Sequence, residues 1–268
     1  MPQLGSRAKK RRGRELLFGT LALVVVASIV AGVTYYGLSR PRGLDPQTMC
    51  PADGPVGHYV LLVDKTDPLT FIQNQAFTVI FKDLIEKRVP EGYLLSVFVL
   101  GDHFQQNAAP LVELCNPGKG VGRSELTSNL TKLRRQYESK FIEPLSKHFN
   151  DLLADRLSET SPIFEMLQLV GLNAFRKHDV SGERRLLIVS DMLQNTPQLS
   201  MYKGPVDYAA FAPTDYAQKT QPDLRGVQVE LHYLMNKPQI QTRRNLQFWE
   251  DFFEKAGARI DLVRPMEG

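Results

Sequence analysis

The sequence is poor in the residues that carry covalent and transition-metal chemistry. Its 268 residues include two cysteines, five histidines and one tryptophan. The cysteines form no Cys-x-x-Cys pair and no Cys/His cluster has zinc-ligand spacing, which excludes zinc fingers and disulfide-dense small folds. The sequence also lacks internal repeats, which excludes solenoids and propellers.

The chain beyond residue 42 lacks a basic charge excess. Residues 1–42 hold 8 of the 33 Lys and Arg residues and one acid, Glu15. The remainder carries 25 basic and 28 acidic residues, a net charge of −3. The sequence pI near 9.0 therefore reflects the N-terminal segment. We expect no nucleic-acid partner, because proteins that bind nucleic acids need a basic surface.

One segment lacks charge altogether. Leu16 to Leu38 runs for 23 residues without a charged side chain, and a helix of that length spans a bilayer core of ~30 Å. The segment is longer than the roughly 7–15 residues of a signal-peptide core. We therefore expect an uncleaved transmembrane helix at residues 16–38, and a long signal peptide is the alternative.

Basic residues are distributed unequally around this segment. Only Arg40 and Arg42 follow it, whereas six precede it: Arg7, Lys9, Lys10, Arg11, Arg12 and Arg14. The positive-inside rule then keeps residues 1–15 in the cytoplasm and places the rest of the chain outside. Tyr35 and Tyr36 stand where an interfacial aromatic belt would be. The expected protein is a single-pass inner-membrane protein, with a linker at 39–57 and a periplasmic or extracellular domain at 58–268.

Strand patterns alternate with amphipathic helices after the linker. Apolar runs predict strands at 58–63, 94–100, 184–190, 226–234 and 260–263, and a shorter strand that ends at Cys115. Helical periodicity occurs at 69–88, from Ser124 to Leu152, after Pro162 and at 242–258. Continuous apolar strands joined by helices are typical of a mainly parallel sheet covered on both faces. The predicted fold class is α/β, doubly wound.

Two of these helices carry finer predictions. The first is expected to bury one apolar face, made of Phe71, Ile72, Phe77, Ile80, Phe81, Leu84 and Ile85. The second would be capped by Ser124. It contains Pro144, where we expect a kink or a break because proline disrupts a helix interior.

The two cysteines, Cys50 and Cys115, both lie in the portion expected outside the cytoplasm. An even pair in an oxidising compartment predicts one disulfide. Two separate thiols are the alternative.

The stretch VDKTDPLT, Val63–Thr70, follows the first strand. Five of the seven positions from Asp64 to Thr70 match DKTGTLT, the phosphorylation loop of P-type ATPases. Those transporters need many membrane spans, and this sequence predicts one. A haloacid-dehalogenase-like phosphatase with Asp64 as nucleophile and Ser190 as second-strand hydroxyl is the alternative function, although Thr66 stands where its loop has a second Asp.

The succession of elements over residues 58–264 resembles a von Willebrand factor A (vWA) domain. Such domains resemble Rossmann folds with one short antiparallel edge strand, a place that PLVELC fits. The resemblance implies a metal-ion-dependent adhesion site. Asp64 and Thr66 match its Asp-x-Ser-x-Ser loop, Thr160 or Ser161 could supply its separate hydroxyl, and Asp191 matches its last acid.

Physical chemistry also places Asp64 and Asp191 together. Both follow strands that the doubly wound order makes neighbours, and ligands gather at the carboxyl ends of such strands. Two carboxylates there suit a hard cation, although an Asp that only caps a turn is the alternative. Pro68 replaces the third hydroxyl of the loop, so we expect Mg²⁺ to bind weakly. No cofactor is certain.

The segment 197–225 between the fourth and fifth strands exceeds the ~12–15 residues of ordinary loops, and longer loops are often functional. Its aromatic residues suit protein contacts or pack back on the domain: Tyr202, Tyr208, Phe211 and Tyr216. The expected function is protein–protein binding or complex assembly, without enzymatic activity.

Overall fold

The computed structural model describes residues 5–38, 43–101, 105, 108–121, 129–153, 158–178 and 180–268. The chain divides into two compact units, Met1–Gly43 and Leu44–Gly268. The second unit begins 14 residues ahead of the domain boundary predicted at His58, so most of the expected linker belongs to the domain.

The first unit is a single helix, α1 (Gly5–Leu38), whose side chains are described from residue 19 to residue 35. Within the described residues, no helix combines the length and the apolar character needed to cross a membrane. The predicted span, 16–38, is longer at both ends than residues 19–35, the part of α1 whose side chains are described. The side chain of Tyr36 and the whole of Arg40 and Arg42 lie outside the described part.

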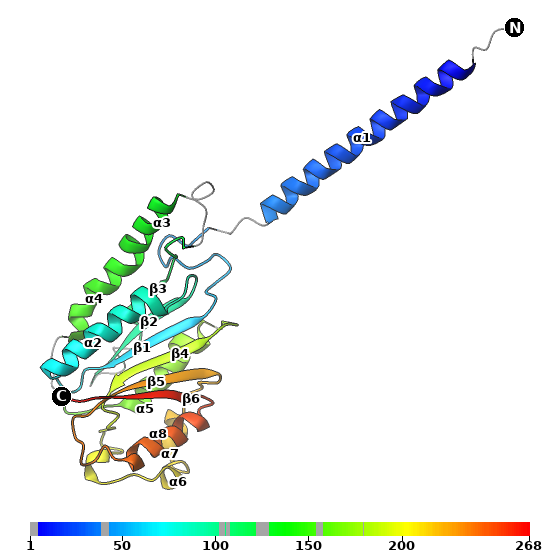
Figure 1. The fold of residues 1–268 in the computed structure, drawn as a ribbon. Coiled ribbons are helices and arrows are strands. Elements are labelled where there is room, and N and C mark those ends of the chain that lie inside the picture. The colour runs from blue at the N-terminus through cyan, green and yellow to red at the C-terminus, as the bar shows by residue number, and fades with distance from the viewer. Residues whose placement is uncertain are drawn as a thin grey trace. The chain divides into compact units, whose positions relative to one another are not determined.

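The second unit is built on a sheet with the strand order β3-β2-β1-β4-β5-β6 (Figure 1). Its described strands are β1 (His58–Asp64), β2 (Leu94–Leu100), β3 (Val112–Cys115), β4 (Arg184–Ser190), β5 (Val227–Leu234) and β6 (Arg259–Met266). The edge strand β3 runs antiparallel to β2, and all other neighbours are parallel. The structure thus has the mainly parallel, doubly wound sheet and the antiparallel edge strand that the sequence predicts.

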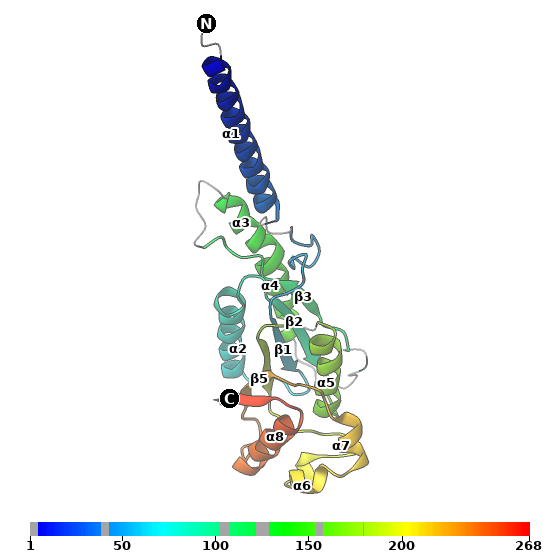
Figure 2. The same cartoon turned by 90° about the vertical axis from the view of Figure 1, so that its right-hand side faces the viewer.

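Helices cover both faces of this sheet (Figures 1 and 2). One face carries α2 (Phe71–Asp83), α3 (Leu130–Tyr137) and α4 (Glu143–Leu153), with π-helical turns at Leu84–Arg88 and Glu138–Ile142. The other face carries α5 (Ile163–Val170) with a π-helical turn at Gly171–Arg176, α6 (Tyr208–Phe211), α7 (Asp215–Thr220) and α8 (Arg243–Lys255). A 3₁₀ turn, Met201–Lys203, follows β4.

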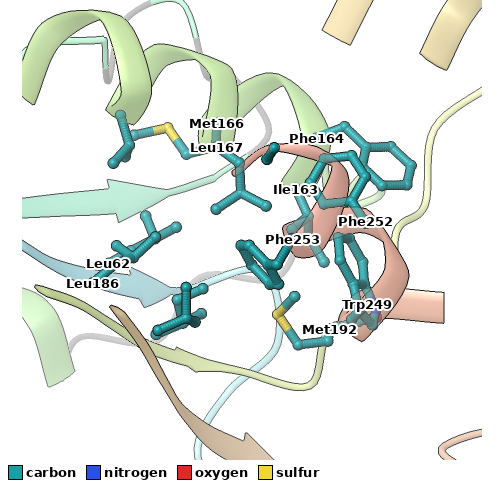
Figure 3. Packing of buried hydrophobic residues seen from close by; sticks show 14 of the residues in the cluster. Leu62, Ile163, Phe164, Met166, Leu167, Leu186, Met192, Trp249, Phe252 and Phe253 are labelled. Atoms are coloured by element: carbon teal, nitrogen blue, oxygen red, sulfur yellow. The ribbon is translucent and has the colours of Figure 1, made fainter. Parts of the chain in front are cut away.

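Strand β1 feeds both hydrophobic layers because successive side chains of a strand point to opposite faces. Val60 and Leu62 join the cluster under α5 and α8, whereas Leu61 and Val63 join the cluster under α2 and α4. Figure 3 shows the first cluster, in which aromatic side chains of α8 meet α5. The buried indole of Trp249 also donates a 2.8 Å hydrogen bond to the Met192 carbonyl, which fixes α8 to the segment after β4.

The predicted apolar face of α2 is wrong at its first turn. Phe71 and Ile72 are 74% and 59% exposed, and Gln73 is buried instead. The buried stripe repeats every four residues through Gln73, Phe77 and Phe81, so the first two residues of the helix fall outside it. Gln73 is satisfied there because its side-chain amide donates to Asn236 Oδ1 at 3.0 Å.

The second predicted helix changes register rather than breaking. The π-helical turn Glu138–Ile142 leads directly into α4, and Pro144 sits in the first turn of α4. The π-helical turn, in which Glu143 N donates to Glu138 O five residues back, shifts the hydrogen-bond register just ahead of Pro144, which has no amide hydrogen to continue the ladder. Asn129 caps α3 by accepting from Lys132 N at 2.9 Å, while Ser124 lies outside the described residues.

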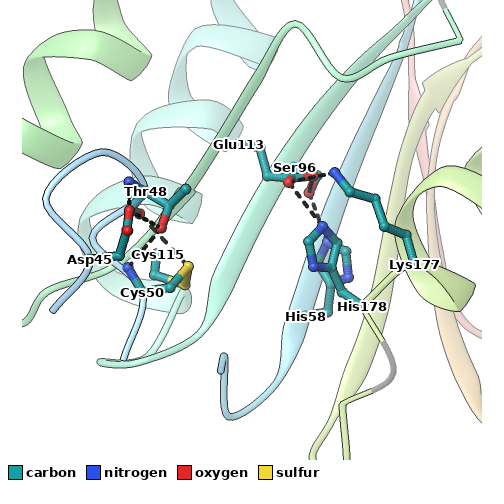
Figure 4. Close-up of polar contacts among 9 residues, drawn as sticks. All are labelled: Asp45, Thr48, Cys50, His58, Ser96, Glu113, Cys115, Lys177 and His178. Carbon is teal, nitrogen blue, oxygen red and sulfur yellow. Dashed lines mark hydrogen bonds and ion pairs between the residues drawn. A yellow bond between two sulfur atoms is a disulfide. The ribbon is translucent and has the colours of Figure 1, made fainter. Parts of the chain in front are cut away.

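The disulfide between Cys50 and Cys115 is confirmed, with an S–S distance of 2.03 Å (Figure 4). A tight turn brings Cys50 to the end of β3. The Asp45 carboxylate accepts from Thr48 N at 2.7 Å, and the Thr48 carbonyl accepts from Cys115 N at 2.8 Å. Part of the predicted linker is therefore attached to the edge strand β3 by these hydrogen bonds and by the disulfide.

Candidate functional site

Two carboxylates meet at the carboxyl edge of the sheet. Asp64 is the last residue of β1, and Asp191 directly follows β4, the strand paired with β1. Their side chains are buried, with 5% and 3% of each residue exposed. The strand order thus brings together two acids that lie far apart in the sequence, as the sequence predicts.

Asp64 is held by hydrogen bonds on both carboxylate oxygens. Thr66 donates to Oδ1 from its backbone N at 2.9 Å and from Oγ1 at 2.7 Å. Ser190 Oγ donates to Oδ2 at 2.6 Å. Burial raises the pKa of Asp64, and these hydrogen bonds oppose that rise because they favour the ionised form.

Asp191 is less well satisfied. Its Oδ1 accepts from Leu193 N at 2.9 Å. Its buried Oδ2 has no hydrogen-bond donor among the described residues, and the Asp67 carboxyl lies within hydrogen-bonding reach of the Asp191 carboxyl and helps to raise its pKa. Burial, and next the charge of Asp64, raise the pKa of Asp191 well above the usual carboxyl range. The site therefore contains one carboxylate that is stabilised as an anion and a second that needs a proton or a cation.

A second oxygen without a partner belongs to Ser161. Its backbone pairs with Asn195, four residues after Asp191, through bonds of 2.8 and 3.0 Å. Ser161 Oγ is buried and has no hydrogen-bond partner in the described part of the chain. The half-buried Thr160 is held by Ser158, whose hydroxyl donates to the Thr160 carbonyl at 2.6 Å. Of the two predicted hydroxyls, Ser161 is the one with an unused buried oxygen.

These oxygens fit a hard cation. Mg²⁺ and Ca²⁺ prefer carboxylate and hydroxyl oxygens and accept water in their remaining positions. Asp191 Oδ2 and Ser161 Oγ are two buried oxygens that a cation would satisfy. Across the described residues, no group of three or more His, Cys, Asp or Glu side chains forms a metal cluster. The candidate ligand set is therefore two acids plus the hydroxyls of Thr66 and Ser161.

The predicted recognition segment 197–225 contains short helices. Asp207 caps α6 through a 2.9 Å bond from Ala209 N, and Thr214 caps α7 through a 3.1 Å bond from Ala217 N. This segment, longer than ordinary loops, therefore carries secondary structure of its own. Short side-chain caps in a segment rich in Ala supply its helical turns.

The four aromatic residues of this segment differ in exposure. Phe211 is buried and stacks on Phe164 at a centroid distance of 4.9 Å. Tyr216 donates to Glu165 Oε1 at 2.7 Å, and Tyr208 packs against the same hydrophobic cluster. Tyr202 is 42% exposed. Burial, and next the charge of Asp191, raise its pKa, so Tyr202 is the aromatic residue that borders the carboxylate site.

A polar network near the amino ends of the parallel strands, away from the carboxylates, was not expected from the sequence (Figure 4). His58 Nε2 lies 2.8 Å from Ser96 Oγ, which donates to Glu113 Oε2 at 3.1 Å. Glu113 Oε1 lies 2.9 Å from His178 Nε2 and 3.1 Å from Lys177 Nζ. Four separate elements supply these residues, and only the topology of the sheet brings them together.

The directions of these hydrogen bonds differ from those of a Ser-His-acid catalytic triad. Ser96 has one hydroxyl proton and gives it to Glu113, so it accepts from the Nε2–H of His58. A serine nucleophile needs the opposite arrangement, in which serine donates to histidine. Burial, and next the charge of His178, lower the pKa of His58 to about 3, so this ring is neutral. The network is a set of donors converging on Glu113.

Comparison with known proteins finds no matching protein-family model and no matching curated sequence. The solved structures similar to this chain include the following two. The VWA domain of SpRpn10 has 12% identity and a TM-score of 0.39, covering 79% of this chain and 89% of that one. An aerotolerance-related membrane protein from Bacteroides fragilis NCTC 9343 has 12% identity and a TM-score of 0.34, covering 76% and 90%. The fold assignment rests on the strand order and the antiparallel edge strand described above.

Proposed function

We propose that this protein is a single-pass, membrane-anchored module whose extracytoplasmic vWA-like domain binds other proteins at the carboxyl edge of its sheet. The observation that carries the proposal is the pair of unused buried oxygens: Asp191 Oδ2, after the strand that pairs with the strand of Asp64, and Ser161 Oγ, in a segment paired with Asn195. A buried polar atom without a partner needs an explanation, and completion of its hydrogen bonding by an ion is one that fits oxygens at this edge of the sheet. If these positions served stability alone, well-packed nonpolar side chains would stabilise the domain as well or better.

The site would hold a divalent cation through Asp64, Asp191, Ser161 and Thr66. A bound Mg²⁺ would offer an electrophilic position to an acidic group of a partner protein. Thr66 and Ser190 orient the Asp64 carboxylate through the three hydrogen bonds described above. Pro68 provides no side-chain oxygen, which favours weak binding with several waters retained.

The membrane anchor is supported by the uncharged run Leu16–Leu38 and by the continuous helix α1 over it. Ser28 and Thr34, two hydroxyl residues of this run, donate to the carbonyls of Val24 and Val30 at 2.8 Å each. Such internal bonds remove the cost of exposing a hydroxyl to lipid. The six-against-two distribution of basic residues favours an external domain.

A capture experiment tests the proposed function. The full chain in neutral detergent is cross-linked to envelope proteins of its own cell with Mg²⁺ or with EDTA. We expect a defined partner that is lost in Asp191→Asn and retained in Asp261→Asn, an exposed acid of β6 paired with Arg259. Identical partner profiles for wild type and Asp191→Asn would contradict the proposal.

Phosphatase activity is the second candidate. Ser190 contacts Asp64 from the neighbouring strand, as expected for the second-strand hydroxyl of a haloacid-dehalogenase-like phosphatase. It predicts turnover of p-nitrophenyl phosphate and a trapped acyl phosphate that Asp64→Ala removes. Protein binding predicts neither. Both carboxylate oxygens of Asp64 accept hydrogen bonds, which lowers the nucleophilicity of the group and favours the binding function.

A further inference from the structure

A cavity of about 220 Å³ opens at the carboxyl edge of the sheet. One wall is formed by residues 201–206, which come after β4, and the other by residues 239–245, which come after β5. Its surface is mainly apolar, from Met201, Pro205, Val206 and Ile240, with polar groups from Gln239, Thr242, Arg244 and Asn245. Nothing in the carboxylate site accounts for this cavity.

The size of the cavity limits what it can hold. Sites for small molecules and cofactors measure roughly 300–1,000 Å³, so this cavity is small for such a ligand. An apolar pocket of this size suits one aliphatic side chain, the kind of anchor that dominates protein–protein affinity when it is fully desolvated.

The cavity is fixed to the segment that carries the carboxylate site. Gln241, in one wall, donates from Nε2 to the Asp191 carbonyl at 2.9 Å. Met201, in the other wall, donates from its backbone N to the Gln194 carbonyl at 2.9 Å. Both walls are thus hydrogen-bonded to residues 191–194. A partner that contacts the carboxylates meets the cavity on the same edge.

The two stretches that form the cavity walls carry more basic than acidic residues. The stretches 201–207 and 237–245 contain one acid, Asp207, and four exposed cations: Lys203, Lys237, Arg243 and Arg244. Arg244 lies 3.6 Å from Asp207, and their side chains are 58% and 56% exposed, so this pair contributes little. The chain beyond residue 42 is net negative, and a local basic rim on such a domain complements an acidic partner.

We propose that this cavity binds an aliphatic side chain of a partner protein segment in which acidic residues flank the aliphatic one. The inference rests on the proposed protein-binding function and adds a second anchoring point to it. Val206 and Ile240 supply the apolar contact, and Arg244 with its neighbouring cations attracts the flanking acids. The partner therefore has an apolar residue within an acidic stretch.

Methyl NMR of the full chain in neutral detergent tests this assignment with defined probes. The first probe is the capped peptide Asp-Asp-Leu-Asp-Asp, the second replaces Leu by Ser, and the third is Lys-Lys-Leu-Lys-Lys. We expect the first peptide to shift the methyl signals of Val206 and Ile240 without shifting those of Ile163, which is fully buried elsewhere in the core. Equal shifts with the Leu and Ser peptides would overturn the proposal.

Two variants sharpen the test. Ile240→Trp fills the cavity and should weaken the Leu peptide by about tenfold or more, the effect of losing an apolar anchor. Because Ile240 also packs against the core, Arg244→Glu provides a change that leaves the fold intact. It should weaken the acidic peptide by roughly two- to fivefold and strengthen the Lys peptide. The matched control is Arg259→Glu, the same charge change at the opposite end of the sheet, which should alter neither.

Failure of this inference and failure of the proposed function are distinguishable. If partner capture depends on Asp191 but the Leu peptide does not bind, or binds Ile240→Trp and Arg244→Glu as it binds wild type, the cavity assignment is wrong and the proposed function stands. If the Leu peptide binds at Ile240 but capture is insensitive to Asp191→Asn, the cavity assignment stands and the proposed carboxylate site is wrong.

Discussion

Ser190 Oγ donates a 2.6 Å hydrogen bond to Asp64 Oδ2, joining the ends of two neighbouring parallel strands across 126 positions of sequence. The same Ser190 oxygen accepts from Met192 N at 2.8 Å. The hydroxyl therefore links the carboxylate of β1 to the backbone that carries Asp191. It sets the orientation of Asp64 and partly offsets the cost of burying its charge.

Replacing Ser190 with alanine should destabilise the domain by about 1.5–3 kcal/mol, because the bond goes to a buried charged group. The free energy of unfolding from urea titration measures this effect. Ser139→Ala is the matched control, since its exposed hydroxyl donates only to the Arg135 carbonyl. A loss below about 0.5 kcal/mol in Ser190→Ala, the usual limit for surface changes, would show that Asp64 does not depend on this bond.

Removing the disulfide should weaken the domain considerably. Cys50 and Cys115 are 65 positions apart, and the chain-entropy relation gives about 4 kcal/mol for a closed loop of this length. The double variant Cys50→Ser/Cys115→Ser should unfold at a lower urea concentration than wild type under oxidising conditions. With dithiothreitol present the difference should nearly vanish. A difference that persists unchanged in reductant would mean that the serines, and not the lost bond, cause the effect.

A buried ion pair should make the free energy of unfolding depend on pH in the acid range. Arg88 forms two hydrogen bonds to Glu230, and His232 Nε2 lies 2.9 Å from Glu230 Oε1. Burial alone would raise the pKa of Glu230, but the hydrogen bonds from His232 and Arg88 lower it to about 2 from the ordinary 4.5. A carboxyl group whose pKa is lowered in the folded state stabilises that state at pH values above its unfolded-state pKa. This contribution is lost as pH falls from about 4.5 to about 2.

Glu230→Gln should remove that contribution, roughly 3 kcal/mol at neutral pH from the size of the pKa difference. Its free energy of unfolding should consequently change less than that of wild type between pH 5 and pH 2. Thermal or urea unfolding across this range measures the slope. Parallel pH profiles for the two proteins would contradict the assignment of the acid-sensitive contribution to Glu230.

Membrane topology is a separate prediction. With residues 1–15 inside and the domain outside, protease added to intact spheroplasts should digest the domain while a cytoplasmic marker survives. Replacing Arg7, Lys9, Lys10, Arg11, Arg12 and Arg14 with Gln should reduce the digested fraction, because the charge asymmetry is removed. Complete protection of the wild-type domain, or its release as a soluble mature form, would contradict this topology.

The features that the sequence predicted correctly depend on local patterns and on one general rule. Apolar runs identified the strands, and the doubly wound order then placed Asp64 beside Asp191. Cysteine parity in an expected oxidising compartment identified the disulfide. In each case a short-range signal is combined with a strong topological preference, so little depends on side-chain packing.

The features that the sequence did not show depend on contacts between distant elements. Burial of Gln73 in place of Phe71 requires the hydrogen bond to Asn236, which lies 163 positions away. The choice of Ser161 over Thr160 as the unused oxygen depends on the backbone pairing with Asn195. The network around Glu113 joins four elements, and the spacing of its members along the chain gives no signal. Such tertiary contacts override local propensity and pattern.

Calorimetric titration of the full chain with Mg²⁺ tests most directly whether the paired carboxylates form a binding site. We expect weak saturable binding, with a dissociation constant on the order of 10⁻⁴–10⁻³ M, that disappears in Asp191→Asn and persists in Asp261→Asn. Identical heats for wild type and Asp191→Asn would contradict the claim that Asp64 and Asp191 form a cation-dependent recognition site.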